Sequence, residues 1–233
     1  MTKPHDMVRD IGVALILFAI AFNLPYIWLA VNFHYPEILR QSPAEILSAF
    51  ADGGRALILG WATFALAALA FAPIAVATGR VTRAPSGVAA LGVAAGVTQA
   101  IGLSRWVYVV PGLAESWENA DDASRAGIEQ LFISLHQFAG VGIGEAIGQT
   151  LTGFWLIGVA MSQRRDPRYG MALGWLGIAG GVALILGLVE GLGTVLDYDP
   201  DLFSFAAMAG FLILTVWMIW TGLCCWRRPE AHD

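Results

Sequence analysis

Long apolar stretches alternate along the chain with short polar connections. Six of these stretches are long enough to cross a hydrocarbon core as helices, which takes about 20 residues each. They lack the period-two alternation of a membrane barrel strand, which needs only about ten residues. The expected spans are residues 11–33, 56–77, 87–110, 132–161, 171–195 and 202–226. The pattern predicts an all-α integral membrane protein whose residues 1–233 form a single domain of six transmembrane helices.

Composition agrees with a membrane environment. Hydrophobic residues make up 57% of the chain and charged residues only 13%, and the mean hydropathy is +0.66. These values lie outside the range of soluble domains of this length. The first apolar stretch follows Lys3 and Arg9, as a signal peptide would, but it is too long and no small-residue cleavage pattern follows it. We therefore expect it to be retained as the first span.

The basic residues predict how the chain is oriented. Lys and Arg in short loops favour the cytoplasmic side of a membrane. Nine of the 13 Lys and Arg residues fall on one side, at the two ends of the chain and in the connections after the second and fourth spans. The other side carries Arg40, Arg55, Arg105 and Arg125, together with most of the carboxylates. Both termini are therefore predicted to be cytoplasmic, and no basic patch suited to nucleic acid is present.

Two outer connections carry helix-start signals. Ser42, Pro43 and Glu45 form a capping-box pattern, followed by apolar residues at helical spacing. This pattern predicts a short amphipathic helix in the first outer loop, ending in a turn at residues 52–54. The fourth helix is expected to start near Asp121, outside the membrane. An unbroken helix from there to Ser162 would be about 60 Å long, twice the hydrocarbon thickness of about 30 Å, so it must protrude, tilt or break.

Residues 135–150 read LHQFAGVGIGEAIGQT and combine polar side chains with glycines. A dinucleotide fingerprint is excluded, because no strand precedes the segment and Glu145 stands where the third glycine would fall. Gly140, Gly144 and Gly148 instead recur every four residues, a spacing that lets two membrane helices approach closely. Similar pairs on the third span and on or beside the fifth are Gly92 and Gly96, Gly170 and Gly174, Gly177 and Gly181, and Gly187 and Gly191. Spans three, four and five are therefore expected to pack as a tight core.

Polar residues inside the spans gather in the predicted outer half. Glu145 lies roughly 25 Å from the cytoplasmic end of its span, counted at about 1.5 Å per residue. A carboxylate at this depth is rare and usually faces a partner, a cavity or a functional path. No span carries an ionisable residue in its inner half, which favours an outward-facing pocket over a pore. The candidate ligand-binding residues are Asn23, Gln99, Arg105, His136, Glu145, Gln149 and Glu190.

Each candidate also has a structural alternative. Glu145 is either a protonated carboxyl that hydrogen-bonds Gln149 or Gln99, or a ligand contact. Arg105 and Glu190 either snorkel or pair at the interface, or line the pocket. His136 is either an interfacial side chain or a ligand and proton carrier.

Metal and catalytic chemistry find little support in the sequence. The chain has no HExxH motif, no CxxC motif and no His pair at i and i+4, so zinc chemistry is disfavoured. A haem held by His34 and His136 as two axial ligands from different helices also has little support. No nucleophile elbow or paired-carboxylate motif occurs. The cofactor is therefore left open.

Several segments resemble a known family. LHQF from Leu135, GFWLIGVAMSQR from Gly153 and PRYGMALGWLGIAGG from Pro167 are similar to bacterial six-helix membrane proteins that carry a domain of unknown function. FADGGRALILGW from Phe50 and GLSRWVYVVPGLA from Gly102 resemble the outer-loop and third-helix regions of the same family. The resemblance implies a six-helix bacterial membrane bundle and no activity. The resemblance gives no support for Glu145 as a site residue, because the glycine-rich segment around Glu145 is not matched.

The leading functional hypothesis is a multi-pass protein of the bacterial inner membrane with an outward-facing polar pocket. The pocket would bind a small amphipathic ligand or a lipid, and the protein would act as a sensor or accessory subunit, alone, as a homo-oligomer or in a larger membrane complex. One alternative is a membrane enzyme that uses Glu145 or His136 as acid or base. The other is a small inverted-repeat transporter, with one half ending near residue 112 and the other starting near residue 126.

Overall fold

The computed structural model describes residues 4–189 and 201–227, and every secondary-structure element in this part is helical. The elements are α1 (Pro4–Phe33), η1 (Glu37–Arg40), α2 (Pro43–Val81), α3 (Ser86–Tyr108), α4 (Val110–Glu118), α5 (Asp122–Leu135), η2 (His136–Ile147), α6 (Gly148–Gln163), α7 (Gly170–Leu186) and α9 (Asp201–Arg227). The all-α prediction is therefore confirmed for the described residues.

Five helical stretches of the described chain are long and apolar enough to cross a membrane: Asp6–Phe33, Pro43–Val81, Ser86–Glu118, Asp122–Gln163 and Phe205–Arg227. A sixth apolar helix, Gly170–Leu186, is shorter. It covers the start of the expected span 171–195, whose end, with Glu190, lies outside the described residues. The helices thus indicate a multi-pass membrane protein.

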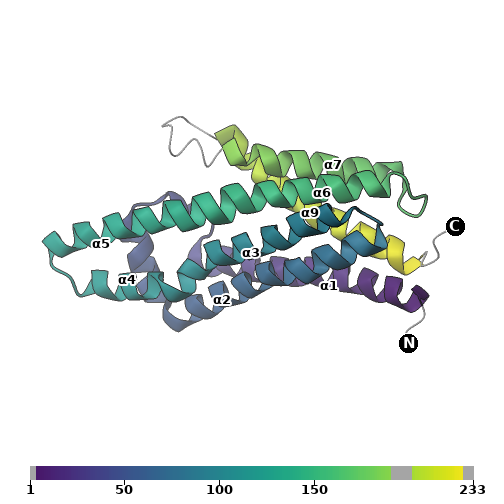
Figure 1. The fold of residues 1–233 in the computed structure, drawn as a ribbon. Coiled ribbons are helices and arrows are strands. Elements are labelled where there is room, and N and C mark those ends of the chain that lie inside the picture. Colours follow the sequence, from purple (N-terminus) through teal and green to yellow (C-terminus); the bar gives the residue numbers. More distant parts are fainter. Residues whose placement is uncertain (1–3, 190–200, 228–233) are drawn as a thin grey trace.

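The helices run along a common direction, so the bundle has two distinct ends (Figure 1). One end carries the start of α1, the end of α9 and the connection between α6 and α7. The opposite end carries α4 and the start of α5. Neighbours along the chain are also neighbours in space, and α9 closes the bundle by packing against both α1 and α7.

The start of α2 follows the predicted capping box. The Ser42 side chain accepts a hydrogen bond from the Glu45 amide, and the Glu45 carboxylate accepts one from the Ser42 amide at 2.9 Å. The helical path breaks at Gly54, whose φ of 52° lies in a region that favours glycine. The segment before the break buries Ile46, Leu47 and other apolar residues, so a separate short helix precedes the long one.

The predicted start of the fourth helix is also confirmed. Asp121 is the N-cap of α5, and its side chain accepts a hydrogen bond from the Ser124 amide at 2.9 Å. Together α5, η2 and α6 form one continuous helical stretch of 42 residues, Asp122–Gln163. The stretch does not break; its middle, η2, changes from α-helical to π-helical geometry.

Two apolar clusters fill the bundle. One centres on Trp61 and Trp106, whose rings stack with centroids 4.7 Å apart, and it includes the short helix at the start of α2. The other centres on Trp155 and Trp217, which meet edge to face at 5.7 Å. The first belongs to the α4 and α5 end of the bundle, and the second joins α1, α6, α7 and α9. Stacked and edge-on aromatic pairs of this kind add to the energy of burial.

The glycine pairs mark close helix contacts. A methyl group placed on Gly102 of α3 would lie 2.6 Å from the Gly144 Cα of η2. One on Gly153 of α6 would lie 2.6 Å from the Gly181 carbonyl of α7. The expected tight packing of these three spans is thus confirmed for the third against the fourth and for the fourth against the fifth.

Candidate functional site

The π-helical segment η2 lies where the fourth span meets α3. Its sequence, HQFAGVGIGEAI, is the glycine-rich stretch singled out above. Glycine has a weak preference for the α-helix, so a run of glycines lowers the cost of departing from it. The π geometry usually occurs as single-turn bulges, often at functional sites, whereas here it extends over 12 residues. The segment is therefore an unusual backbone feature of the described chain.

Arg105 is buried against this segment, with 7% of its surface exposed. Its Nη1 donates to the Gly102 carbonyl on its own helix at 2.5 Å, and its Nη2 lies 3.4 Å from His136 Nδ1. The guanidinium also lies 5.2 Å from the Trp106 ring centroid. Arg105 thus turns back into the bundle and does not snorkel, because Gly140 has no side chain to occupy the space that the guanidinium fills.

Glu145 supplies the opposite charge, since its carboxylate interacts electrostatically with the Arg105 guanidinium. Arg105 and Glu145 come from different helical segments, α3 and η2. A buried charge is tolerated in an apolar bundle only when it is paired and hydrogen-bonded. Arg105 Nε is nevertheless buried without a hydrogen-bond partner. The cluster of Arg105, His136 and Glu145 therefore retains an unfilled donor at Arg105 Nε.

The contact with Arg105 fixes the protonation pattern of His136. Arginine has only donors, so His136 Nδ1 is the acceptor of this pair and the proton of the neutral ring resides on Nε2. The His136 ring stacks on Phe132, with centroids 5.6 Å apart, and is half-buried. Within residues 4–189 and 201–227, Arg105 Nε and His136 Nε2 make no hydrogen bond, and both are donors.

Two other predicted residues lie around a separate small cavity. Asn23 donates to Thr215 Oγ1 at 3.1 Å, and Gln99 donates to Thr152 Oγ1 at 2.8 Å. All four line a cavity of about 30 Å³ together with apolar side chains of α1, α2 and α9. A cavity of this size, lined mainly by apolar side chains, is too small for an amphipathic ligand. The hydrogen-bond partners of Gln99 lie on α6: Thr152 and the Gly148 carbonyl, the latter 3.5 Å from the Gln99 amide nitrogen.

The remaining candidates lie apart from the cluster. Gln149 is directed toward α7, because a methyl group on Gly187 would lie 2.9 Å from its Oε1. His34 is exposed, has a φ of 50° and follows the end of α1. Glu190 lies outside the described residues. Of the seven predicted ligand-binding residues, the structure brings Arg105, His136 and Glu145 into one group and places Asn23 and Gln99 around one cavity.

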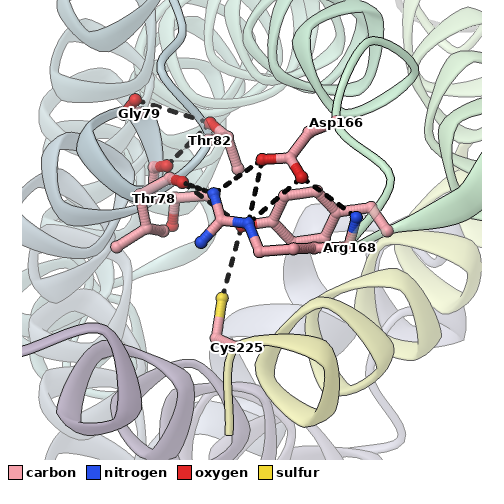
Figure 2. A network of polar contacts seen from close by, with 8 residues as sticks. Thr78, Gly79, Thr82, Asp166, Arg168 and Cys225 are labelled. Atoms are coloured by element: carbon pink, nitrogen blue, oxygen red, sulfur yellow. Dashed lines mark hydrogen bonds and ion pairs between the residues drawn. The ribbon is translucent and has the colours of Figure 1, made fainter. Parts of the chain in front are cut away.

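A second polar network occupies the opposite end of the bundle, beside the α6–α7 connection (Figure 2). Arg168 is 6% exposed. Its Nε and Nη2 donate to the Asp166 carboxylate at 2.9 and 2.6 Å, and Nη2 also donates to the Val81 carbonyl at 2.8 Å. The ion pair thereby ties the connection to the end of α2. The Tyr169 hydroxyl lies 3.3 Å from the same carbonyl and 3.5 Å from Cys225 Sγ on α9.

Burial and hydrogen bonding shift the pKa values of Asp166 and Tyr169 in this connection. Burial alone would raise the pKa of Asp166, but the hydrogen bonds and charge of Arg168 outweigh it and hold this pKa below its usual range. Burial raises the pKa of the Tyr169 phenol, and Cys225 adds to the rise. Asp166 is therefore ionised and Tyr169 neutral near neutral pH.

Comparison with known proteins identifies the family. A model of the DUF4386 domain, a domain of unknown function, matches residues 11–222. The chain belongs to this family. The match confirms the resemblance inferred from the sequence, and it extends through the glycine-rich segment around Glu145. No curated protein matches the chain, and no solved structure matches it.

Sequence reasoning missed several buried polar residues of this DUF4386 protein. Arg168 was counted only as one of the charges that orient the chain, although Asp166 two residues earlier is an available signal for an ion pair within a tight connection. Gln163 is fully buried, accepts from Trp217 Nε1 at 3.0 Å and donates to Thr221 at 3.0 Å. Its position at the end of an apolar run gave no sign of these two partners on α9.

Proposed function

We propose that this protein binds an amphipathic molecule through the cluster of Arg105, His136 and Glu145 and acts as a membrane sensor or accessory subunit. The single observation that supports this proposal is the buried Arg105 of α3, which lies against His136 and Glu145 of the π-helical segment η2 and keeps an unfilled donor. A charge in an apolar bundle is costly, and such residues usually mark a ligand or ion site.

The hydrogen-bond pattern specifies the head group of the ligand. Arg105 Nε and His136 Nε2 both donate, so the ligand must present acceptor oxygens, as a carboxylate or a carbonyl does. A head group that offers only donors finds no partner there. The apolar tail would lie along the exposed hydrophobic side chains nearby, among them Tyr108 of α3 and Phe138 of η2.

Access to Arg105 requires a movement of η2, because its Nε is closed off. A π-helix is rare and usually extends over a single turn within an α-helix. A segment with two arrangements, π-helical and α-helical, would give a ligand a state to select. A ligand that favours one arrangement would shift the packing of the fourth span against α3. This shift is the signal that a sensor would transmit.

The proposal includes a membrane topology. The chain would cross the bacterial inner membrane six times, with α7 and the residues after it as the fifth crossing and with both termini in the cytoplasm. The uneven distribution of Lys and Arg supports this orientation. The cluster of Arg105, His136 and Glu145 would then lie in the outer half of the bilayer.

The first experiment is native mass spectrometry of the protein released from a mild detergent, which reports any retained non-covalent mass. It is followed by thermal unfolding with two probes that share an 18-carbon tail, oleate and oleylamine. We expect oleate to raise the melting temperature and oleylamine to leave it unchanged, because the unfilled positions are donors. Equal effects of the two probes would contradict the proposed site.

Two variants link this stabilisation to the cluster. Glu145→Gln removes the charge that competes for Arg105, so it should bind oleate more tightly than the wild type. His136→Phe keeps an aromatic ring but removes the donor, so it should bind oleate more weakly. The exposed Arg55→Gln serves as a control for non-specific attraction by surface charge. A loss in the control equal to that in His136→Phe would reject the assignment.

A further inference from the structure

A groove of about 260 Å³ opens beside the α6–α7 connection, at the end of the bundle opposite the cluster of Arg105, His136 and Glu145. It is lined by Pro167, Arg168, Tyr169, Gly170, Trp220, Cys224 and Arg227. These residues come from the connection, the start of α7 and the end of α9. None of the described lining residues is acidic. Asp166 balances the charge of Arg168, so the positive charge of the groove comes from Arg227.

Two arginines line this groove. Arg168 is more than nine-tenths buried, and Asp166 and Val81 occupy its Nε and Nη2. Its Nη1 makes no hydrogen bond within residues 4–189 and 201–227, and Figure 2 draws no contact to it. Arg227 is exposed, and in the described chain it forms no ion pair. Guanidinium groups presented in this way suit phosphate oxygens.

The start of α7 adds backbone donors to the same groove. The first amides of a helix have no partner within it, and the helix dipole gives this end a partial positive charge. The N-cap residue Tyr169 makes no side-chain capping hydrogen bond. Gly170 has a φ of 72°, and a methyl group there would meet nothing within 4 Å. The helix start is therefore uncapped and open toward the groove.

We infer that this groove binds the phosphate of an anionic phospholipid head group. Trp220 is 43% exposed beside the arginines, and tryptophan favours the interface where a lipid head group meets its tails. A basic pocket between helices on the cytoplasmic side is a known arrangement for anionic lipids. The predicted orientation places the groove on that side. The site is independent of the ligand proposed for the cluster of Arg105, His136 and Glu145.

The test measures how much phosphatidylglycerol the full-length protein retains. The protein is reconstituted in bilayers of phosphatidylcholine with phosphatidylglycerol, and the retained lipids are counted by native mass spectrometry after detergent release. Removing one arginine near a membrane surface weakens attraction to anionic lipid about fivefold. We expect this loss in Arg227→Gln and recovery in Arg227→Lys, which restores the charge. Arg165→Gln, an exposed arginine of the same connection outside the groove lining, should match the wild type.

Two results would overturn the inference. Equal retention of phosphatidylglycerol by Arg227→Gln and Arg165→Gln would show that the groove does not select the lipid. Inorganic phosphate provides the second comparison. If it raised the melting temperature of the wild type but not of Arg227→Gln, while phosphatidylglycerol was retained no better than phosphatidylcholine, the groove would be a site for soluble phosphate.

Discussion

The contact between α3 and η2 is testable with a single methyl group on Gly102. A Cβ there would lie 2.6 Å from the Gly144 Cα and 2.9 Å from the Ala139 carbonyl oxygen. Both atoms belong to the backbone, so neither can turn away as a side chain would. Gly102→Ala must therefore push η2 away from α3.

The magnitude follows from two opposing terms. Overpacking of a close contact costs about 1–3 kcal/mol, while replacing glycine by alanine within a helix gains up to about 1 kcal/mol. We expect Gly102→Ala to lose about 1–2 kcal/mol net. Gly112→Ala is the matched control, because a methyl group on Gly112 of α4 meets nothing within 4 Å. The control should keep only the helix-propensity gain.

The assay is thermal unfolding in one fixed detergent, followed by tryptophan fluorescence. A change of 1 kcal/mol shifts the melting temperature of a protein of this size by about 2–4 °C. The two variants share the helix-propensity gain, so Gly102→Ala should melt at least about 2 °C below Gly112→Ala. A Gly102→Ala variant as stable as Gly112→Ala would refute the close backbone contact and, with it, the position of η2 against Arg105.

Three further predictions concern the polar groups. Arg105→Met should destabilise the protein by about 1.5–3 kcal/mol, because it removes the charged hydrogen bond to the Gly102 carbonyl and the electrostatic attraction to Glu145. A Glu145→Gln change in the same chain should recover part of this loss in a double-mutant cycle of unfolding free energies. Gln163→Leu should cost about 1–3 kcal/mol by leaving the buried Trp217 N–H without an acceptor, and a melting temperature equal to the wild type would contradict this. Asp166 has a lowered pKa in the folded protein, so its contribution to stability is present above its unfolded pKa of about 4 and is lost as the pH falls through the folded value. Asp166→Asn should therefore be less stable at neutral pH and lose less stability on acidification below about pH 4, and parallel curves for variant and wild type would count against the ion pair.

The network around Arg168 and the cluster around Arg105 lie at opposite ends of the bundle and differ in their hydrogen bonding. The Arg168 pair with Asp166 has complementary partners and fastens the α6–α7 connection to α2. The group around Arg105 is incompletely satisfied and borders the π-helical segment. A buried donor without a partner calls for a functional explanation, and Arg105 Nε is such a donor. The ligand site of the proposed function is therefore assigned to the Arg105 cluster.

The sequence by itself determined the helical class, the multi-pass membrane character and most helix starts. These features depend on local information: apolar runs of fixed length, the capping box at Ser42 and the cap at Asp121. The glycine spacing also predicted that the third and fourth spans pack closely, because a missing side chain is visible in the sequence. Arg105, His136 and Glu145 were recognised as candidates because polar residues are rare in such spans.

The tertiary structure decided which of these residues meet. Heights along the spans placed Asn23, Gln99 and Arg105 in the same predicted half of the membrane. The heights did not give the rotation of each helix about its axis. The rotation of α3 directs Gln99 toward Thr152, and it directs Arg105 toward His136 and Glu145. The π geometry of η2 and the pairing of Gln163 with α9 also depend on contacts between segments distant in sequence. Local patterns encode which helices form and which residues are costly to bury, whereas the partners that offset this cost are fixed only when the helices pack.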